Sequence, residues 1–478
     1  MVRSLFRTKS IERILADSEA PEHRLKKTLT AWDLTGLGIG AIIGTGIFVL
    51  IGTAIVGDAH RPGAGPGITL SFVLSGLTCA LAALCYAEFA AMIPVAGSAY
   101  TYSYATLGEF LAWLTGWNLI LEYGVACVAV AIGWSGYLNN ILKLCGIELP
   151  YWATHPPGAD GGIANLPAAI IVLLVTIILV IGVKESARAT CAIVLVKLGV
   201  ILFFLVVGMG SVDTANWTPF MPYGFDGVGA AAAIVFFAYV GFDAVSTTAE
   251  EARNPQRDLP IGIIASLSLC TLLYIAVAAV LTGLVPYTKI DIHAPVAEAL
   301  NVVGYRWGAA IVATGAVAGI TSVLVVMMIG QIRVFFAMSR DGLLGPWLSR
   351  VHPRYRTPHH ATYLTGIAVA ILAAFIPIGD AADMTNIGTL FAFVLVCIGV
   401  VVLRYTKPNY PRPFRVPLMP IIPILGMLAC LGLMTFLPTL TWIRFIVWTI
   451  IGIIVYVFYG SRHSRLTVPS QEISGSSA

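Results

Sequence analysis

The chain has 478 residues, of which 58% are hydrophobic and 11% are charged, and its formal net charge is +4. A soluble globular protein carries about 25% charged residues. This composition therefore excludes an ordinary soluble domain and favours a membrane protein with many spans.

Twelve apolar segments long enough to cross a bilayer follow one another along the chain. A hydrocarbon core about 30 Å thick needs about 20 residues of helix, and irregular backbone cannot face lipid. The segments therefore predict an all-α polytopic bundle with twelve transmembrane helices. They are Asp33–Val56, Ile68–Ile93, Thr106–Tyr137, Leu166–Val183, Ala189–Gly210, Gly227–Thr247, Pro260–Leu284, Trp307–Met338, Ala361–Pro377, Met384–Leu403, Val416–Pro438 and Trp442–Tyr459.

Lysine and arginine are distributed unevenly between the two sides of this bundle. With the N-terminus in the cytoplasm, 22 of the 28 fall on inner segments, five on outer loops, and Lys197 within a span. Cytoplasmic loops carry the excess of basic residues in membrane proteins. The pattern predicts a cell-membrane protein with both termini cytoplasmic, and it explains the basic charge without any nucleic-acid partner.

The first span contains four glycines within the eleven residues GIGAIIGTGIF, from Gly38 to Phe48. A dinucleotide-binding fingerprint would need one residue fewer between its second and third glycines. Close helix packing through Gly40 and Gly44 stays open as an interpretation. A discontinuous helix, whose free N–H groups hold an anionic group at mid-membrane, is favoured, because packing alone would need fewer glycines.

A second interruption occurs five segments later, in the sixth span. The stretch VFFAYVGFDAVSTT contains Gly241 and, two residues on, Asp243. Spans one and six would then begin two successive five-helix units. Paired breaks at corresponding positions predict an inverted-repeat transporter with its site between them.

The motifs GIGAIIGTGIF, CYAEFAAMIPVAGSAYTYSY, GWNLILEYG, GFDAVSTTAEEARNPQRDLPIGI and SRDGLLG resemble those of the amino acid–polyamine–organocation superfamily, and within it the cationic amino acid transporter family. The resemblance implies a leucine-transporter-like core of five plus five helices with two added C-terminal helices. It also implies amino-acid transport by alternating access without a cofactor or metal. The expected parts are a cytoplasmic tail (1–27), the core (28–411, with repeats of about 28–211 and 226–411), two helices (412–460) and a cytoplasmic tail (461–478).

The resemblance also implies a substrate site. Four residues of the first span match the segment whose amides hold the substrate carboxylate: Ile43, Gly44, Thr45 and Gly46. Phe237, Ala238 and Val240 match the segment whose carbonyls receive the ammonium, with Phe237 as a gate. Met327 is expected near the substrate side chain, with ordinary core packing as the alternative. Because animal cationic transporters generally carry a smaller or polar residue there, Met327 argues against arginine or lysine as the substrate.

Lys197 is a charged residue deep in the fifth span. Such a residue costs about 2.5–3.5 kcal/mol or more on insertion scales, so it should face a cavity or a partner. Glu122 and Asp243 are the candidate partners, and all three are expected to take part in proton coupling. By resemblance, Lys197 matches the lysine at the sodium position of sodium-coupled relatives, which implies sodium independence. A lysine that only ties helices together is the alternative.

The sequence contains no HExxH, GxSxG or P-loop motif, so an enzyme is not expected. We interpret the chain as a secondary active amino-acid transporter, sodium-independent and proton-coupled, which favours small neutral L-amino acids but leaves cationic ones open. An amino-acid or polyamine exchanger and a nutrient receptor on a transporter fold are the alternatives. The expected partners are the amino acid, protons and the lipid bilayer, and the sequence leaves open whether a small membrane subunit binds.

Overall fold

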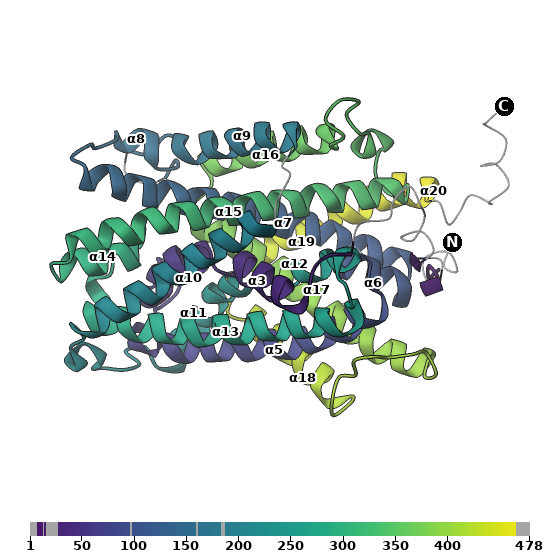
Figure 1. The fold of residues 1–478 in the computed structure, drawn as a ribbon, viewed down its shortest axis with the longest axis horizontal. Helices are drawn as coiled ribbons and strands as arrows, with labels where there is room; N and C mark the ends of the chain where they lie inside the picture. Colours follow the sequence, from purple (N-terminus) through teal and green to yellow (C-terminus); the bar gives the residue numbers. More distant parts are fainter. Residues whose placement is uncertain are drawn as a thin grey trace.

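The computed structural model describes residues 7–12, 14–15, 27–95, 98–158, 161–182 and 187–464. In this part of the chain the fold is a bundle of helices that lie mostly along one long axis (Figure 1). Two isolated bridge pairs, Leu29 with Ala252 and Gly57 with Pro62, are its extended contacts.

The long helices are α5 (Ile68–Met92), α7 (Glu109–Leu144), α10 (Ala187–Met209), α13 (Pro255–Leu284), α15 (Arg306–Arg340) and α17 (Ile378–Thr406). Helix α19 (Thr439–Val455) has 17 residues by itself and belongs to a continuous span of 25 residues that ends at His463. The shorter α-helices are α3 (Ala31–Ile42), α4 (Ile51–Val56), α6 (Ser98–Thr106), α8 (Tyr151–Thr154), α9 (Leu166–Ile181), α11 (Gly224–Val235), α12 (Ala244–Thr247), α14 (Pro295–Val302), α16 (His359–Phe375), α18 (Ile421–Met434) and α20 (Ser461–His463). Two π-helical turns, η1 (Gly46–Leu50) and η8 (Tyr456–Gly460), and six 3₁₀ turns complete the order: η2 (Gly65–Gly67), η3 (Thr214–Trp217), η4 (Phe236–Tyr239), η5 (Ala249–Glu251), η6 (Tyr287–Lys289) and η7 (Pro346–Ser349).

Among the described residues, eight helices are long and apolar enough to cross a membrane, or nine when α3 and the helix Gly46–Val56 count as one bent span. Three further apolar helices, α9, α16 and α18, have 16, 17 and 14 residues. They fall short of the roughly 20 residues that a span requires. An all-helical membrane fold is thus confirmed, whereas the count of twelve spans, the inverted repeat and the domain boundaries stay predictions.

The structure departs from the predicted segments mainly at helix ends and in two short helices. The third predicted span continues past Tyr137 to Leu144 within α7. Ser98–Thr106 and Pro295–Val302 form α6 and α14, which the segment pattern does not predict. Both are too short to cross a membrane, so a search for apolar runs of spanning length passes over them.

The two interrupted spans lie at the centre of the bundle. In the most apolar window of the Gly224–Thr247 span, 94% of the residues are buried, against 22% in the last span, Thr439–His463. A span that is covered by protein on all sides can tolerate irregular backbone, since neighbouring helices supply hydrogen-bond partners in place of water. The breaks therefore occur where neighbouring helices can supply hydrogen-bond partners to the backbone groups that the breaks leave unpaired.

Candidate functional site

The first span is broken at the predicted position. Helix α3 ends at Ile42, and Ile43 has extended backbone angles (φ −74°, ψ 105°). The chain resumes as the π-helical turn η1 at Gly46, and the two halves are bent by 42°. The break therefore coincides with the glycine-rich stretch of the sequence.

The sixth span is interrupted beside it. Helix α11 gives way to the 3₁₀ turn η4, and Gly241 follows with φ +115°, a conformation that favours glycine. A β-carbon on Gly241 would lie 3.0 Å from the carbonyl oxygen of Ala41. Gly46 lies directly against the backbone of Ala238, so each break holds a glycine that lets the other backbone approach.

The glycines of the first span have two separate roles. Gly38 packs against Ser266 of α13, and a β-carbon on Gly40 would lie 2.9 Å from a methyl of Val194 in α10. These two glycines fit the helix-packing interpretation. Gly44 and Gly46 belong to the break and face the space between the spans.

A helix that ends inside a membrane leaves carbonyl groups that need donors from other helices. The ammonium of Lys197 donates to the carbonyl of Gly40 at 2.5 Å. The hydroxyl of Tyr274 in α13 lies 3.0 Å from both the Ile42 and the Ala238 carbonyls, one from each broken span. Tyr137 donates to the Phe48 carbonyl at 2.7 Å.

A small cavity lies between the two breaks. Its free space is about 10 Å³, which is room for roughly one water, so the site is closed in this state. The buried hydroxyl of Thr45 has no hydrogen-bond partner among the described residues. The cavity is lined by Ala41, Ile42, Gly44, Thr45, Gly46, Ala126, Val130, Phe237, Val240, Val323 and Met327.

The cavity brings together six of the residues that the sequence predicts for the substrate site, namely Gly44, Thr45, Gly46, Phe237, Val240 and Met327. Ile43 and Ala238 are buried but do not line it. Sequence reasoning missed the other five lining residues, which are Ala41 and Ile42 at the end of α3, Ala126 and Val130 in α7, and Val323 in α15. Small apolar residues in an apolar span carry no signal that separates a cavity wall from ordinary packing.

Asp243 and Glu122 form a buried acidic pair at the other end of the second break. Asp243 accepts hydrogen bonds from Tyr123 (2.8 Å) and Ser98 (3.4 Å), while its second oxygen has no partner. In the described part of the chain neither oxygen of Glu122 has a hydrogen-bond partner, and the hydroxyl of Thr389 donates to the carbonyl of Thr385 at 3.0 Å. Within the described chain neither acid forms an ion pair with Lys197, contrary to the partnership proposed from the sequence.

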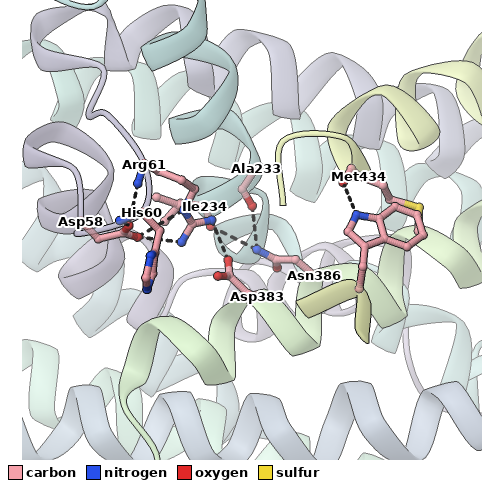
Figure 2. Close-up of polar contacts among 9 residues, drawn as sticks. Asp58, His60, Arg61, Ala233, Ile234, Asp383, Asn386 and Met434 are labelled. Carbon is pink, nitrogen blue, oxygen red and sulfur yellow. Dashed lines mark hydrogen bonds and ion pairs between the residues drawn. The ribbon is translucent and has the colours of Figure 1, made fainter. Parts of the chain in front are cut away.

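At one end of the bundle, an ion-pair network joins the loop after the first span to α17 (Figure 2). Arg61, in the loop after the first span, contacts Asp58 and, in α17, Asp383, each at 2.8 Å. Burial alone would raise the pKa of Asp58, but Arg61 and the His60 amide outweigh it and hold that pKa below its ordinary value. Nearby, Asn386 donates to the Ala233 carbonyl at the end of α11 (2.7 Å).

The opposite end is closed by the N-terminal segment. The side chain of Ile11 is fully buried, and Lys9 forms an ion pair with Asp341 at 3.5 Å. Asp341 follows α15 and also accepts a hydrogen bond from Tyr100 of α6 at 2.6 Å. Contacts at both ends therefore separate the central cavity from either side of the membrane.

Comparison with known proteins shows which proteins this chain is similar to. A family model described as amino acid permease matches residues 29–458. A methylthioribose transporter of Bacillus subtilis is 50% identical over 464 residues, which is 97% of this chain and 99% of the relative. A branched-chain amino acid permease of the same organism is 50% identical over 470 residues, 98% of this chain and 100% of the relative. A vacuolar cationic amino acid transporter of Arabidopsis thaliana is 38% identical over 417 residues, 85% of this chain and 68% of the relative.

Proposed function

The chain belongs to the amino acid permease family, whose members are transporters and not enzymes, and on that premise we propose that it is a secondary active transporter of small neutral L-amino acids. It works by alternating access, without sodium, and is driven by protons. The observation that carries this proposal is the closed, apolar cavity between two broken spans.

The two breaks suit the two ends of an amino acid. Gly44 lies outside regular helix, and the second half of the span starts beside it at Thr45 and Gly46. The Ile43 amide already donates to the Ile39 carbonyl at 2.9 Å, so the N–H groups proposed for the carboxylate are those that follow Ile43, as at a helix N-terminus. The unpaired hydroxyl of Thr45 adds a donor. Carbonyl groups around Phe237 and Val240, where the sixth span is interrupted, suit the ammonium group. The Phe237 carbonyl accepts from the Val240 amide at 3.2 Å and keeps a second lone pair for a ligand.

The walls of the cavity suit a short neutral side chain. Val130, Val323 and Met327 are apolar, and no charged residue lines the cavity among the described residues. A guanidinium or ammonium group placed against such walls would lose its water without gaining a partner. The same walls make arginine and lysine poor substrates.

The hydrogen bond from Lys197 supports sodium independence. The Gly40 carbonyl is the kind of oxygen that a coupling cation binds at an unwound helix, and the ammonium already occupies it. A lysine on a neighbouring helix can release this oxygen when it loses its proton.

The acidic pair is a second, independent observation that supports proton coupling. Glu122 and Asp243 are fully enclosed and carry carboxylate oxygens without partners. An ionised carboxylate in such a place costs several kcal/mol or more, so at least one member carries a proton in this closed state. In this proposal Lys197 and the acidic pair are separate proton-binding groups, since no ion pair joins them among the described residues.

Uptake into proteoliposomes tests the proposal. The panel is labelled alanine, leucine, arginine and methylthioribose, because two relatives with different named cargoes are equally identical to this chain. Sodium and pH gradients are set independently, and protein-free liposomes are the control. Alanine should accumulate without sodium, and faster when the outside is acidic.

The alternatives give other results in the same assay. Uptake that requires preloaded amino acid would indicate an exchanger, and binding without accumulation would indicate a nutrient receptor. A preference for arginine or for methylthioribose over alanine, or a requirement for sodium, would contradict the proposal.

A further inference from the structure

A second cavity lies away from the substrate site, where the first turns of α13 meet the loop between α17 and α18. It encloses about 580 Å³ and is open to the surroundings. Its lining residues are Gln256, Arg257, Pro260, Ile261, Ile264, Ala265, Pro413 and Phe414. We refer to these eight residues as the α13 crevice.

The α13 crevice is polar at one end and apolar along the rest. Residues 257, 261 and 265 recur at the spacing that places side chains on one helix face. Arg257 lies at the start, and Ala265 lies about 12 Å further along the helix axis at 1.5 Å per residue. The exposed apolar side chains of Leu269 and Leu272 continue the helix surface beyond it, as expected of a helix that faces lipid.

The polar end carries uncompensated positive charge. Arg257 is exposed, and its guanidinium has no hydrogen bond or ion pair in the part of the chain that the structure describes. Arg415 is not one of the eight lining residues, but it follows Phe414 directly in the chain, is exposed, and likewise has no described partner. The neighbouring Asp258 does not neutralise Arg257, because it is buried and accepts a hydrogen bond from the amide of Asn254 at 3.2 Å.

We propose that the α13 crevice binds one anionic phospholipid. Its phosphate lies at Arg257 and Arg415, and one acyl chain lies along Pro260, Ile261 and Ala265. Along the crevice a positive charge is followed by an apolar wall, and along a phospholipid a charged headgroup is followed by apolar acyl chains. Basic pockets at the ends of transmembrane helices bind anionic headgroups in this way. The distribution of lysine and arginine in the sequence predicts that this is the cytoplasmic leaflet.

The site is connected to the first broken span. The amide of Arg253, four residues before Arg257, donates to the Leu29 carbonyl at 2.8 Å, and the Leu29 amide donates to the Glu251 carbonyl at 2.9 Å. Leu29 is followed by Thr30, the residue that caps the start of α3. A lipid that steadies the start of α13 therefore steadies the segment from which the first span must move when this end of the bundle opens.

Lipid binding is measured first, because it does not depend on the cargo. Native mass spectrometry of the purified full chain compares phosphatidylglycerol with phosphatidylcholine of the same acyl chains. The Arg257→Gln/Arg415→Gln double variant is compared with Arg350→Gln/Arg354→Gln, which removes the same charge from exposed arginines outside the crevice. Each arginine near an anionic surface contributes about fivefold in affinity, so the first pair should weaken phosphatidylglycerol binding at least fivefold. The second pair should leave it unchanged.

If phosphatidylglycerol binding fell equally in both double variants, or did not fall in Arg257→Gln/Arg415→Gln, the proposed lipid site would be wrong. Displacement of phosphatidylglycerol by an equal concentration of its water-soluble glycerophosphate headgroup would overturn the acyl-chain part. Uptake in liposomes with and without phosphatidylglycerol then tests the connection to transport. The wild type and the Arg350/Arg354 variant should gain from the anionic lipid, and the crevice variant should not. The binding result stands by itself if no cargo is transported at all.

Discussion

Lys197 donates a hydrogen bond from its ammonium to the carbonyl oxygen of Gly40, 157 residues earlier in the chain. In an uninterrupted helix this carbonyl would accept from the amide of Gly44, which lies past the end of α3. The lysine thus replaces a backbone bond that the break removes. The same bond joins α10 to the first half of the broken span.

Replacing Lys197 should disable transport. A hydrogen bond to a charged group contributes about 1.5–3 kcal/mol, so Lys197→Ala should lower uptake about tenfold or more. Lys197→Arg should not restore proton-driven uptake, because arginine does not deprotonate in proteins. The measurement is alanine uptake at several external pH values with sodium absent. An unchanged response to pH in Lys197→Ala would remove this residue from the coupling mechanism.

Tyr274→Phe should destabilise the contact between the two breaks. The single proton of this hydroxyl lies within reach of both the Ile42 and the Ala238 carbonyls and is shared between them, and leaving a buried carbonyl unpaired costs about 1–3 kcal/mol. Tyr239→Phe is the matched control, because its partner, the Phe72 carbonyl, lies inside the regular helix α5. Melting temperature and uptake should both fall further for Tyr274→Phe than for Tyr239→Phe. Equal effects would mean that the bridging position has no special role.

Gly44→Ala should weaken substrate binding more than it weakens the fold. The added methyl would lie 3.0 Å from a methyl of Val323, at a cavity with room for roughly one water. Gly36→Ala is the control in the first half of the same broken span, since nothing lies within 4 Å of the β-carbon that it would add. Alanine in place of a glycine inside a helix stabilises by about 0.5–1 kcal/mol where space allows. Normal uptake affinity in Gly44→Ala would leave the glycine a packing role only.

Met327→Ser should widen the range of cargo. The terminal methyl of Met327 would lie 3.0 Å from a β-carbon on Gly241, so the side chain fills the space beside the second break. Serine removes that volume and offers a hydroxyl to a polar side chain. Competition by arginine against labelled alanine should therefore strengthen. Met328→Ser is the control. Met328 is buried at the next position but does not line the cavity, so this substitution should leave the selectivity unchanged.

Arg61→Gln should destabilise the closed state strongly. Asp383 would lose its partner while buried, and breaking a buried ion pair costs about 3–5 kcal/mol. Arg444→Gln breaks the exposed pair with Asp380 and should cost about 0–1 kcal/mol. Thermal unfolding in detergent compares the two, and similar losses would contradict the assignment.

The Asp58 contact should add no pH dependence to transport near neutrality. Its pKa is lowered in the folded protein, so the stability that it contributes is present above the ordinary carboxyl pKa and is lost only as the pH falls through the lowered value. Uptake of Asp58→Asn measured between about pH 5 and 8, the usual range of maximal stability, should therefore follow the wild-type pH profile. A changed profile in that range would contradict this.

Local features of the sequence anticipated the class of the protein and the positions of both breaks. Long apolar runs require helices in a membrane, and the clustered glycines near Gly44 and the lone Gly241 mark backbone that leaves the regular helix. These signals depend on neighbours in the chain, so they can be recognised without a fold. The resemblance to a transporter family, and not these local signals, predicted the eight residues of the substrate site, and six of them line one cavity.

Only the tertiary structure decided the partners. Tyr274 is an ordinary apolar-span tyrosine in the sequence, and its position between two carbonyls depends on how α13 packs across both broken spans. Lys197 was expected near an acid, yet it lies on the Gly40 carbonyl, while Asp383 pairs with an arginine 322 residues away. Such contacts depend on helix rotation and depth, because a single turn of helix brings different side chains to the same neighbour. Residue type alone predicts that a buried polar group needs a partner, and packing determines which one it finds.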